Sequence, residues 1–201
     1  MDIRAAADNP LLDFTGLPRF ASFSPEHVLP AMDALIAEGR SVVDRVALDG
    51  SEPSWDGVVQ PLEDANERVS RAWGQVAHLN NVVNSPALRE AYNAALPRVT
   101  QYFTEQGQDL RLYRRFRALR GAPAFELLSV PRRRLLENRL RDFRLGGAEL
   151  PSHDKAHFQA LQEELAALGS RFQENLLDAT NAFAEIVSDP AELDEIGRAH
   201  V

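Results

Sequence analysis

The sequence predicts an all-α protein, an irregular bundle of about five to seven helices that ends in a long coiled-coil-like helix. Apolar residues recur at steps of three and four through successive segments, the spacing of amphipathic helices. Proline and glycine separate these segments or lie near their starts, so several helices should be proline-kinked. Strand-like alternation never extends beyond a few residues, and no repeat of about 34 or 40 residues indicates a solenoid.

Composition limits the class of protein. The chain has 201 residues, of which 44% are hydrophobic, enough for one sizeable domain or two small ones. It has no cysteine, which excludes disulfides and thiolate metal ligands and favours a reducing compartment. The first 14 residues lack the apolar core of a secretory signal, and no window approaches the length of a membrane span. We therefore expect a soluble cytoplasmic protein that contacts no membrane.

Charge is distributed unevenly along the chain. The formal net charge is −8, but the segment Arg111–Arg144, here called the arginine belt, holds eleven arginines against three acidic residues. This segment therefore carries +8 and the remainder carries −16. Such a belt can bind a polyanion such as nucleic acid, or it can pair with acidic helices of its own chain. We favour the second interpretation, and nucleic acid is not an expected partner.

Residues 1–23 contain turn signals, and we expect an extended amino-terminal arm that packs on the helices. This arm has too many apolar residues for a free tail: Leu11, Leu12, Phe14, Leu17, Phe20 and Phe23. Residues 24–195 then form the helical domain. Its helices are predicted over residues 24–49, 54–83, 86–103, roughly 124–145 and 152–187.

Local signals mark the starts and irregularities of these helices. Ser24 and Ser54 are predicted amino-terminal caps. Pro30, Pro61 and Pro97 fall within helical patterns and should bend or interrupt them.

Two helix ends carry further expectations. The third pattern either continues through Leu119 or breaks at Gly107. The last helix has a near-heptad apolar seam from Phe158 to Ile186 and should end before Asp189-Pro190. So long a seam requires a cover from the earlier chain or from a part outside this sequence.

Residues 196–201 look foreign to the protein, because they match one translated frame of a common sequencing adapter. We expect a non-native tail, and therefore a natural protein that continues beyond this point.

Two histidines have the spacing of a zinc-binding helix. His153 and His157 are four residues apart, as in H-E-x-x-H, but Asp154 replaces the glutamate and no third ligand is evident. A solvated helix start is the better account of this pair.

The remaining histidines carry no catalytic pattern. His27 is expected in a local capping role, and His78 at the edge of the core. The chain lacks a nucleophile elbow and a phosphate-binding loop, and spacing indicates no Ser/His/Asp set.

Two further groups of side chains also favour a structural reading. Asn80, Asn81 and Asn84 cluster at a helix end, where asparagine caps helices, although peptide binding stays open. The larger aromatic residues can be read as a base-stacking set but lie at core spacing: Trp55, Trp73, Tyr92, Tyr102 and Tyr113. The residues alone thus predict no catalytic or metal-binding site, and substrate-binding residues stay unassigned.

Several strings in a fixed order nevertheless carry a family resemblance. They are Asn9-Pro10-Leu11-Leu12; Phe20 and Phe23; Pro25 to Ala31; Trp55 with Gln60-Pro61-Leu62; His78-Leu79-Asn80; Val83 to Tyr92; Arg141-Asp142-Phe143; Gly146; Leu150-Pro151; Leu168-Gly169; Phe172; Asn175; and Leu177 to Thr180. Together they resemble the amino-terminal region of bacterial members of the thimet-oligopeptidase family of zinc metallopeptidases. The resemblance covers nearly all of residues 8–195.

The resemblance implies a helical domain that forms one wall of a deep channel for short unfolded peptides. In this family a second, larger region carries H-E-x-x-H and a further glutamate, which bind one zinc ion. His153 and His157 do not correspond to those ligands. We therefore expect a chain without a cofactor or activity of its own, whose partner is the catalytic region of the same protein. Short peptides are the expected substrates of that whole protein. The alternative is a free-standing helical module that binds an anionic partner through the arginine belt.

Overall fold

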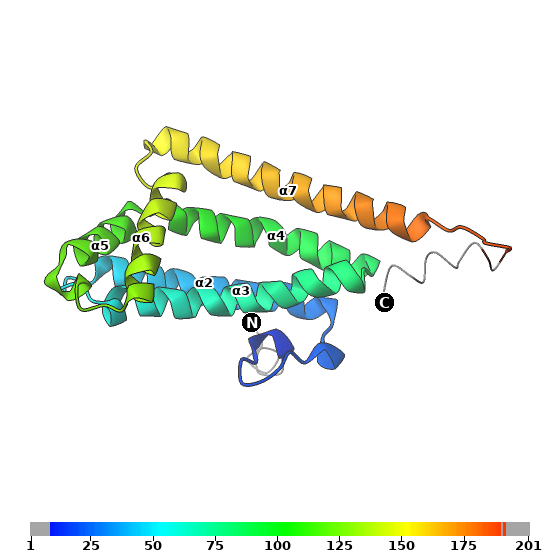
Figure 1. The fold of residues 1–201 in the computed structure, drawn as a ribbon, viewed down its shortest axis with the longest axis horizontal. Helices are drawn as coiled ribbons and strands as arrows, with labels where there is room; N and C mark the ends of the chain where they lie inside the picture. The colour runs from blue at the N-terminus through cyan, green and yellow to red at the C-terminus, as the bar shows by residue number, and fades with distance from the viewer. Residues whose placement is uncertain (1–8, 190, 192–201) are drawn as a thin grey trace. The chain divides into compact units, whose positions relative to one another are not determined.

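The structure is a computed structural model that describes residues 9–189 and 191. Every regular element in that part of the chain is helical, which confirms the predicted class (Figure 1). The α-helices are α2 (Val28–Leu48), α3 (Gln60–Val82), α4 (Pro86–Gly107), α5 (Leu110–Gly121), α6 (Val130–Leu145) and α7 (Ser152–Ala182). None of these helices combines the length and the apolarity that a bilayer crossing requires.

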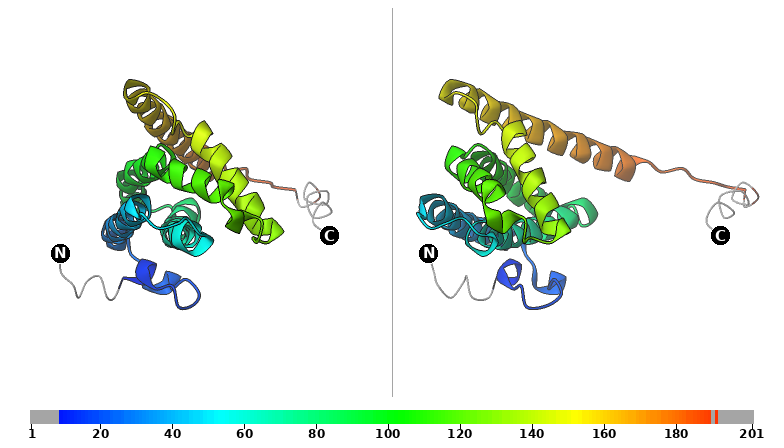
Figure 2. Two further views of the ribbon diagram at one scale, coloured as in Figure 1. Left: turned by 90° about the vertical axis from the view of Figure 1, so that its left-hand side faces the viewer. Right: turned by 60° about the vertical axis from the view of Figure 1, so that its left-hand side comes forward.

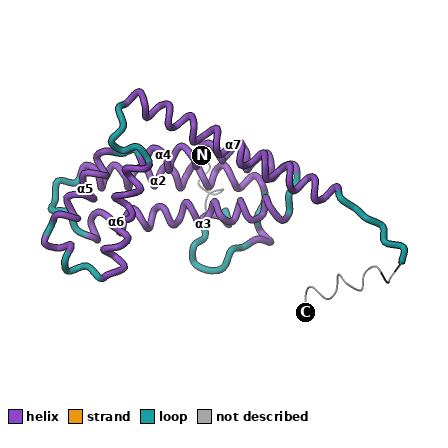
Figure 3. The backbone as a smooth tube through the Cα atoms, turned by 45° about the horizontal axis from the view of Figure 1, so that its top comes forward, coloured by secondary structure: helices purple, strands orange, loops and turns teal. Residues whose placement is uncertain are grey.

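The chain divides into two units, residues 1–168 and 169–201, and the division falls inside α7. The first unit holds α2 to α6 and the first part of α7. Within it α2, α3 and α4 lie side by side, and α5 and α6 pack together at one end of them (Figures 1 and 2). The tube in Figure 3 shows the same arrangement, with short loops between the helices.

The first unit has a core in two parts. At the end formed by α5 and α6, the core contains Val42, Val43, Val46, Trp55, Val58, Val59, Leu62, Ala65, Leu112, Tyr113, Phe116, Leu119, Phe125, Leu136, Phe143 and Ala148. At the opposite end it contains Leu11, Val28, Ala31, Met32, Leu35, Ile36, Val69, Ala72, Val76, Leu79, Leu88, Ala95, Val99 and Tyr102. Apolar burial on this scale is the main stabilising contribution to the unit.

Residues 9–23 contribute to the second part of this core. The Asn9 side chain is 3% exposed, accepts the Leu11 backbone N–H at 3.0 Å and donates to the His27 carbonyl at 2.9 Å. The Arg68 guanidinium lies over the Phe14 ring, 5.0 Å from its centroid. The arm is not uniformly extended, because short 3-10 turns form at Pro10–Leu12 and Phe20–Ser22.

Irregular turns precede α2 and α3, as the proline positions predict. A 3-10 turn (Pro25–His27) leads into α2, and a π-helical turn (Trp55–Val59) leads into α3. The Ser54 hydroxyl accepts the Gly57 backbone N–H at 3.1 Å, which confirms that residue as a cap. Pro97 lies inside α4, where it removes one hydrogen bond from the helix.

Asp109 explains why the third helical pattern breaks at Gly107 and does not continue through Leu119. Helix α4 ends at Gly107, and the Asp109 carboxylate accepts the backbone N–H groups of Arg111 (2.8 Å) and Leu112 (3.3 Å) at the start of α5. Two helices therefore replace the single long one that the apolar pattern also allows.

Two predicted boundaries are wrong. Helix α6 begins at Val130 and not near Ala124, because Pro131 suits a first helical turn, where its missing N–H removes no internal bond. Helix α7 ends at Ala182 and not at Val187. Phe183 is 75% exposed and therefore gains no packing that would extend the helix. The suspected foreign tail, residues 196–201, lies outside the described residues.

Gly39 permits the close approach of α2 and α4, and its replacement should be costly. A Cβ atom there would lie 2.3 Å from the hydroxyl oxygen of Tyr102, a side chain only 1% exposed. We expect Gly39→Ala to lower the free energy of unfolding by about 1–3 kcal/mol, because the core cannot expand freely.

Urea denaturation checks this value against a matched control. No atom lies within 4 Å of a Cβ at Gly74. Gly74→Ala should therefore raise stability by about 0.5–1 kcal/mol through helix propensity alone. Addition of Tyr102→Phe should restore part of the Gly39→Ala loss. Equal effects of the two alanine substitutions would contradict this packing argument.

Asp109 should make stability depend on pH. Burial tends to raise the pKa of its carboxyl, but hydrogen bonds from the Arg111 side chain and from the Arg111 and Leu112 backbone hold that pKa below its usual value. A pKa depressed in the folded state contributes stability above the unfolded value of about 3.9, and loses it as the pH falls through the folded value.

Asp109→Ala should therefore cost about 1–2 kcal/mol at pH 7. The difference in the free energy of unfolding between this variant and the parent chain should narrow below about pH 4. Thermal unfolding at pH 7 and pH 3 measures this difference. Asp109→Asn is the control, because it keeps a neutral cap. A stability difference of the same size at both pH values would refute this link between the pKa of Asp109 and stability.

Candidate functional site

The structure places both histidines with the spacing of a zinc site, His153 and His157, on the surface. His153 has a side chain 81% exposed and lies 3.2 Å from Asp154, while His157 is exposed one turn later on α7. No group of three or more His, Cys, Asp or Glu side chains that could hold a metal occurs among residues 9–189 and 191. The arrangement fits the solvated helix start favoured above.

His27 and His78 also have structural surroundings. The His27 Nδ1 atom accepts the Ser24 backbone N–H at 3.0 Å, which confirms its local capping role. His78 is exposed, and its ring lies 5.7 Å from that of Phe20.

The asparagine cluster marks the end of α3. Asn84 adopts φ 47°, the left-handed conformation common after a helix, and accepts both Nε and Nη2 of Arg89 at 3.1 and 2.9 Å. Asn81 is exposed. Asn80 is 7% exposed, and its Oδ1 atom has no hydrogen-bond partner among the described residues.

The aromatic set belongs to the core, as predicted. Trp55, Tyr102 and Tyr113 are buried. The rings of Trp73 and Tyr92 stack on each other at 4.6 Å and pack against the second part of the core.

The arginine belt pairs largely with its own chain. Its carboxylate pairs are Arg111 with Asp44 and Asp109, Arg115 with Asp49, Arg120 with Glu137, Arg133 with Glu126, Arg139 with Glu63, and Arg141 with Asp142. Arg117 lies over the Tyr113 ring and Arg132 over the Trp55 ring. The preference for acidic partners elsewhere in the chain is therefore confirmed at Arg111, Arg115 and Arg139.

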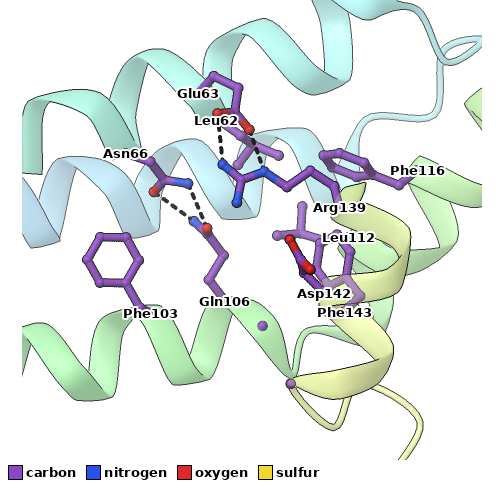
Figure 4. A pocket seen from close by; sticks show the side chains of 12 residues that line it. Leu62, Glu63, Asn66, Phe103, Gln106, Leu112, Phe116, Arg139, Asp142 and Phe143 are labelled. Carbon is purple, nitrogen blue, oxygen red and sulfur yellow. Dashed lines mark hydrogen bonds and ion pairs between the residues drawn. The ribbon is translucent and has the colours of Figure 1, made fainter. Parts of the chain in front are cut away.

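A cavity of about 280 Å³ lies where α3, α4, α5 and α6 meet (Figure 4). Its floor is formed by buried core side chains, namely Leu62, Leu112, Phe116 and Phe143, and Phe103 at its edge is 37% exposed. Polar side chains complete the wall: Glu63, Asn66, Gln106, Arg139 and Asp142. Because the floor is part of the core, a molecule in this cavity would contact the interior of the first unit.

An ion pair connects α6 to α3 across the cavity. Arg139 Nε donates to Glu63 Oε1 at 2.7 Å, and Arg139 Nη2 donates to Glu63 Oε2 at 2.8 Å (Figure 4). These hydrogen bonds raise the pKa of the Arg139 guanidinium, against the effect of its burial. The two-point geometry fixes the orientation of both side chains.

A reciprocal amide pair connects α3 to α4. Asn66 Nδ2 donates to Gln106 Oε1 at 2.7 Å, and Gln106 Nε2 donates to Asn66 Oδ1 at 3.1 Å. The Tyr102 hydroxyl donates to the same Asn66 oxygen at 2.8 Å. Burial raises the pKa of Tyr102, so the hydroxyl remains a neutral donor.

Two glycines bring α4 and α6 together beside these bridges. A Cβ atom on Gly146 would lie 3.2 Å from the Gly107 carbonyl oxygen and 3.1 Å from that of Asp142. The ends of the two helices therefore approach at backbone distance. Polar bridges and a backbone contact thus join α3, α4 and α6 around a space that side chains do not fill.

Sequence reasoning did not single out Glu63, Asn66 or Gln106, and it included Arg139 only as a member of the arginine belt. One signal was present, since Asn66 is a polar residue at helical spacing from Leu62 on the apolar face of α3. Its partner on α4 lies forty positions away, and no local pattern identifies such a pair.

The fold and this cavity define an all-helical domain whose helices are tied together by intramolecular polar bridges. The profile of the family described as "Neurolysin/Thimet oligopeptidase, N-terminal domain" matches residues 32–155. The chain therefore belongs to the thimet oligopeptidase family, as an amino-terminal domain.

Curated relatives agree with this assignment. The chain is 38% identical to oligopeptidase A of Salmonella typhimurium over 185 residues, which cover 92% of this chain and 27% of that protein. Identity and coverage are the same for oligopeptidase A of Escherichia coli. A probable cytosolic oligopeptidase A of Arabidopsis thaliana is 33% identical over 188 residues, 94% of this chain and 27% of that protein. The chain thus spans about a quarter of the length of these relatives.

The bridge between α6 and α3 should show measurable coupling. A double-mutant cycle of Arg139→Ala and Glu63→Ala, measured by urea denaturation, should give a coupling free energy of about 1 kcal/mol. The value is modest because both side chains keep some solvent exposure. Arg133 and Glu126 provide the control, because their single contact is 3.5 Å long and the Glu126 side chain is 72% exposed. That cycle should give no measurable coupling. Coupling of equal size in both cycles would contradict the assigned role of the Arg139–Glu63 bridge.

Proposed function

We propose that this chain forms the amino-terminal helical domain of a cytoplasmic zinc metallo-oligopeptidase that hydrolyses short peptides. The observation that carries the proposal is the match of residues 32–155 to the amino-terminal domain of this family. Identity of 38% to two bacterial oligopeptidases A over 92% of the chain supports it.

In this proposal the domain supplies one wall of the peptide channel, and another region of the protein supplies the chemistry. The resemblance assigns the zinc ligands and the catalytic glutamate to that other region, where the metal would activate water for attack on a peptide carbonyl. The residues described here would limit access to the channel and position its wall. The chain alone would bind no catalytic zinc and cleave no peptide.

The apolar seam of α7 gives this proposal a physical contact surface. In the first unit, Leu161 and Leu165 are 49% and 64% exposed; in the second, Phe172 is 69% exposed. A row of large apolar side chains in water marks an interaction surface. We assign it to the remainder of the protein, because the relatives are several times longer than this chain.

The alternative function, binding of an anionic partner through the arginine belt, has less support. Pairs such as Arg111–Asp44 and Arg139–Glu63 already commit guanidinium groups to the chain's own carboxylates. A salt-sensitive binding curve to a nucleic acid at physiological salt would favour this alternative.

Zinc analysis and a peptidase assay test the proposal directly. The 201-residue chain should contain no stoichiometric zinc after incubation with the metal and dialysis, and should not cleave an internally quenched peptide. Full-length oligopeptidase A of Escherichia coli serves as the positive control in both measurements. Stoichiometric zinc together with turnover by the chain would refute the proposed division of labour.

A further inference from the structure

The cavity between α3, α4, α5 and α6 has the properties of a preformed binding site. Its apolar floor consists of side chains such as Leu112 and Phe116, which are 0% and 2% exposed and are held in place by the surrounding core. A cavity of about 150 Å³ lined by apolar side chains can hold benzene. The present volume of about 280 Å³ therefore accommodates one large aromatic or aliphatic side chain.

The bridges across the opening keep this space available. Arg139 holds Glu63, and Asn66 holds Gln106, so these polar groups largely satisfy one another. A ligand consequently gains most of its binding free energy from an apolar group that covers this floor. A site that is already formed loses little conformational entropy when it binds.

The Asp142 carboxylate offers a cationic group one contact at the opening. Glu63 pairs with Arg139, and Arg141, which does not line the cavity, pairs with the Asp142 carboxylate. Arg141 donates only to Asp142 Oδ1, and Asp142 Oδ2 has no hydrogen bond among the described residues. In Figure 4 this carboxylate points toward the space between Arg139 and Gln106.

One buried donor is also left for a ligand. Asn66 is 8% exposed, and its Nδ2 atom donates a single hydrogen bond, to Gln106, within the described part of the chain. A primary amide nitrogen carries two protons, so one remains for an acceptor such as a carbonyl oxygen.

We propose that this cavity binds the amino-terminal residue of a short peptide with a large apolar side chain. The side chain covers the floor, the α-ammonium group faces Asp142, and the first carbonyl accepts the free N–H of Asn66. This inference does not depend on the proposed function, because it requires neither zinc nor a catalytic region. A small arylalkylamine shares the ring and the ammonium group but lacks the carbonyl.

Titration of the 201-residue chain with defined probes tests the recognition chemistry. Phe-Gly-Gly with a free amino terminus should shift the amide signals of Gly107 and the side-chain NH2 signals of Asn66 and Gln106 in ¹⁵N-correlated NMR spectra. Ala-Gly-Gly should bind at least about tenfold more weakly, because it covers little of the floor. N-acetyl-Phe-Gly-Gly should bind about threefold more weakly, as expected for loss of a half-exposed charge contact. Phenethylamine should also bind more weakly, because it cannot use Asn66.

Two variants with matched controls locate the site. Asp142→Asn should remove the preference for the free amino terminus, while Asp154→Asn, at an exposed carboxylate outside the cavity, should not. Gly107→Leu should abolish binding of every probe. A Cβ atom there meets only the Gly146 Cα, at 3.9 Å, so the first atom of the new side chain fits beside that backbone. Gly74→Leu is its control on the open face of α3.

Several outcomes would overturn the proposal. They are equal binding of the Phe and Ala peptides, equal binding of phenethylamine and Phe-Gly-Gly, and binding that survives Gly107→Leu. If Gly107→Leu does not fold, as judged by circular dichroism, an unchanged preference for the free amino terminus in Asp142→Asn would overturn it instead. None of these outcomes bears on zinc content or peptide cleavage, so failure here is distinguishable from failure of the proposed function.

Discussion

The contact between Tyr102 and Gly39 sets the packing of the first unit. The tyrosine is almost fully buried against the glycine, and its hydroxyl donates to Asn66. One side chain therefore sets the approach of α2 to α4 and joins α4 to α3. The amide pair and the Arg139–Glu63 bridge continue this tie along α3 to α6. Directional bonds of this kind specify where helices lie, whereas apolar burial supplies most of the stabilising free energy.

The cavity is a consequence of the same ties. Helices joined only by apolar side chains would move together until the space between them was filled, because protein interiors are close-packed. Here the polar bridges and the backbone contact of Gly107 with Gly146 hold the ends of the helices at fixed positions. In the functions proposed above, one domain would form a channel wall and also hold a small site of its own.

Helical periodicity and capping signals predicted most of the fold from the sequence. They predicted the all-α class, the cap at Ser54, the role of His27 and the burial of Trp55. They failed where tertiary context decides, as at the end of α7, where exposed side chains give the helix no support. The cavity was not predictable, because its bridges join residues far apart in the chain, such as Glu63 and Arg139. The family resemblance came from the order of many short strings and not from any single chemical motif.

The central claim is a helical body that folds on its own core but presents an uncovered apolar seam on its last helix. Amide hydrogen exchange of the 201-residue chain, followed by mass spectrometry, tests this claim most directly. Slow exchange across α2 to α4, where Val69 and Val99 are buried, and fast exchange over residues 172–182 is the predicted result. Exchange in α2 to α4 as fast as in residues 172–182 would contradict the account.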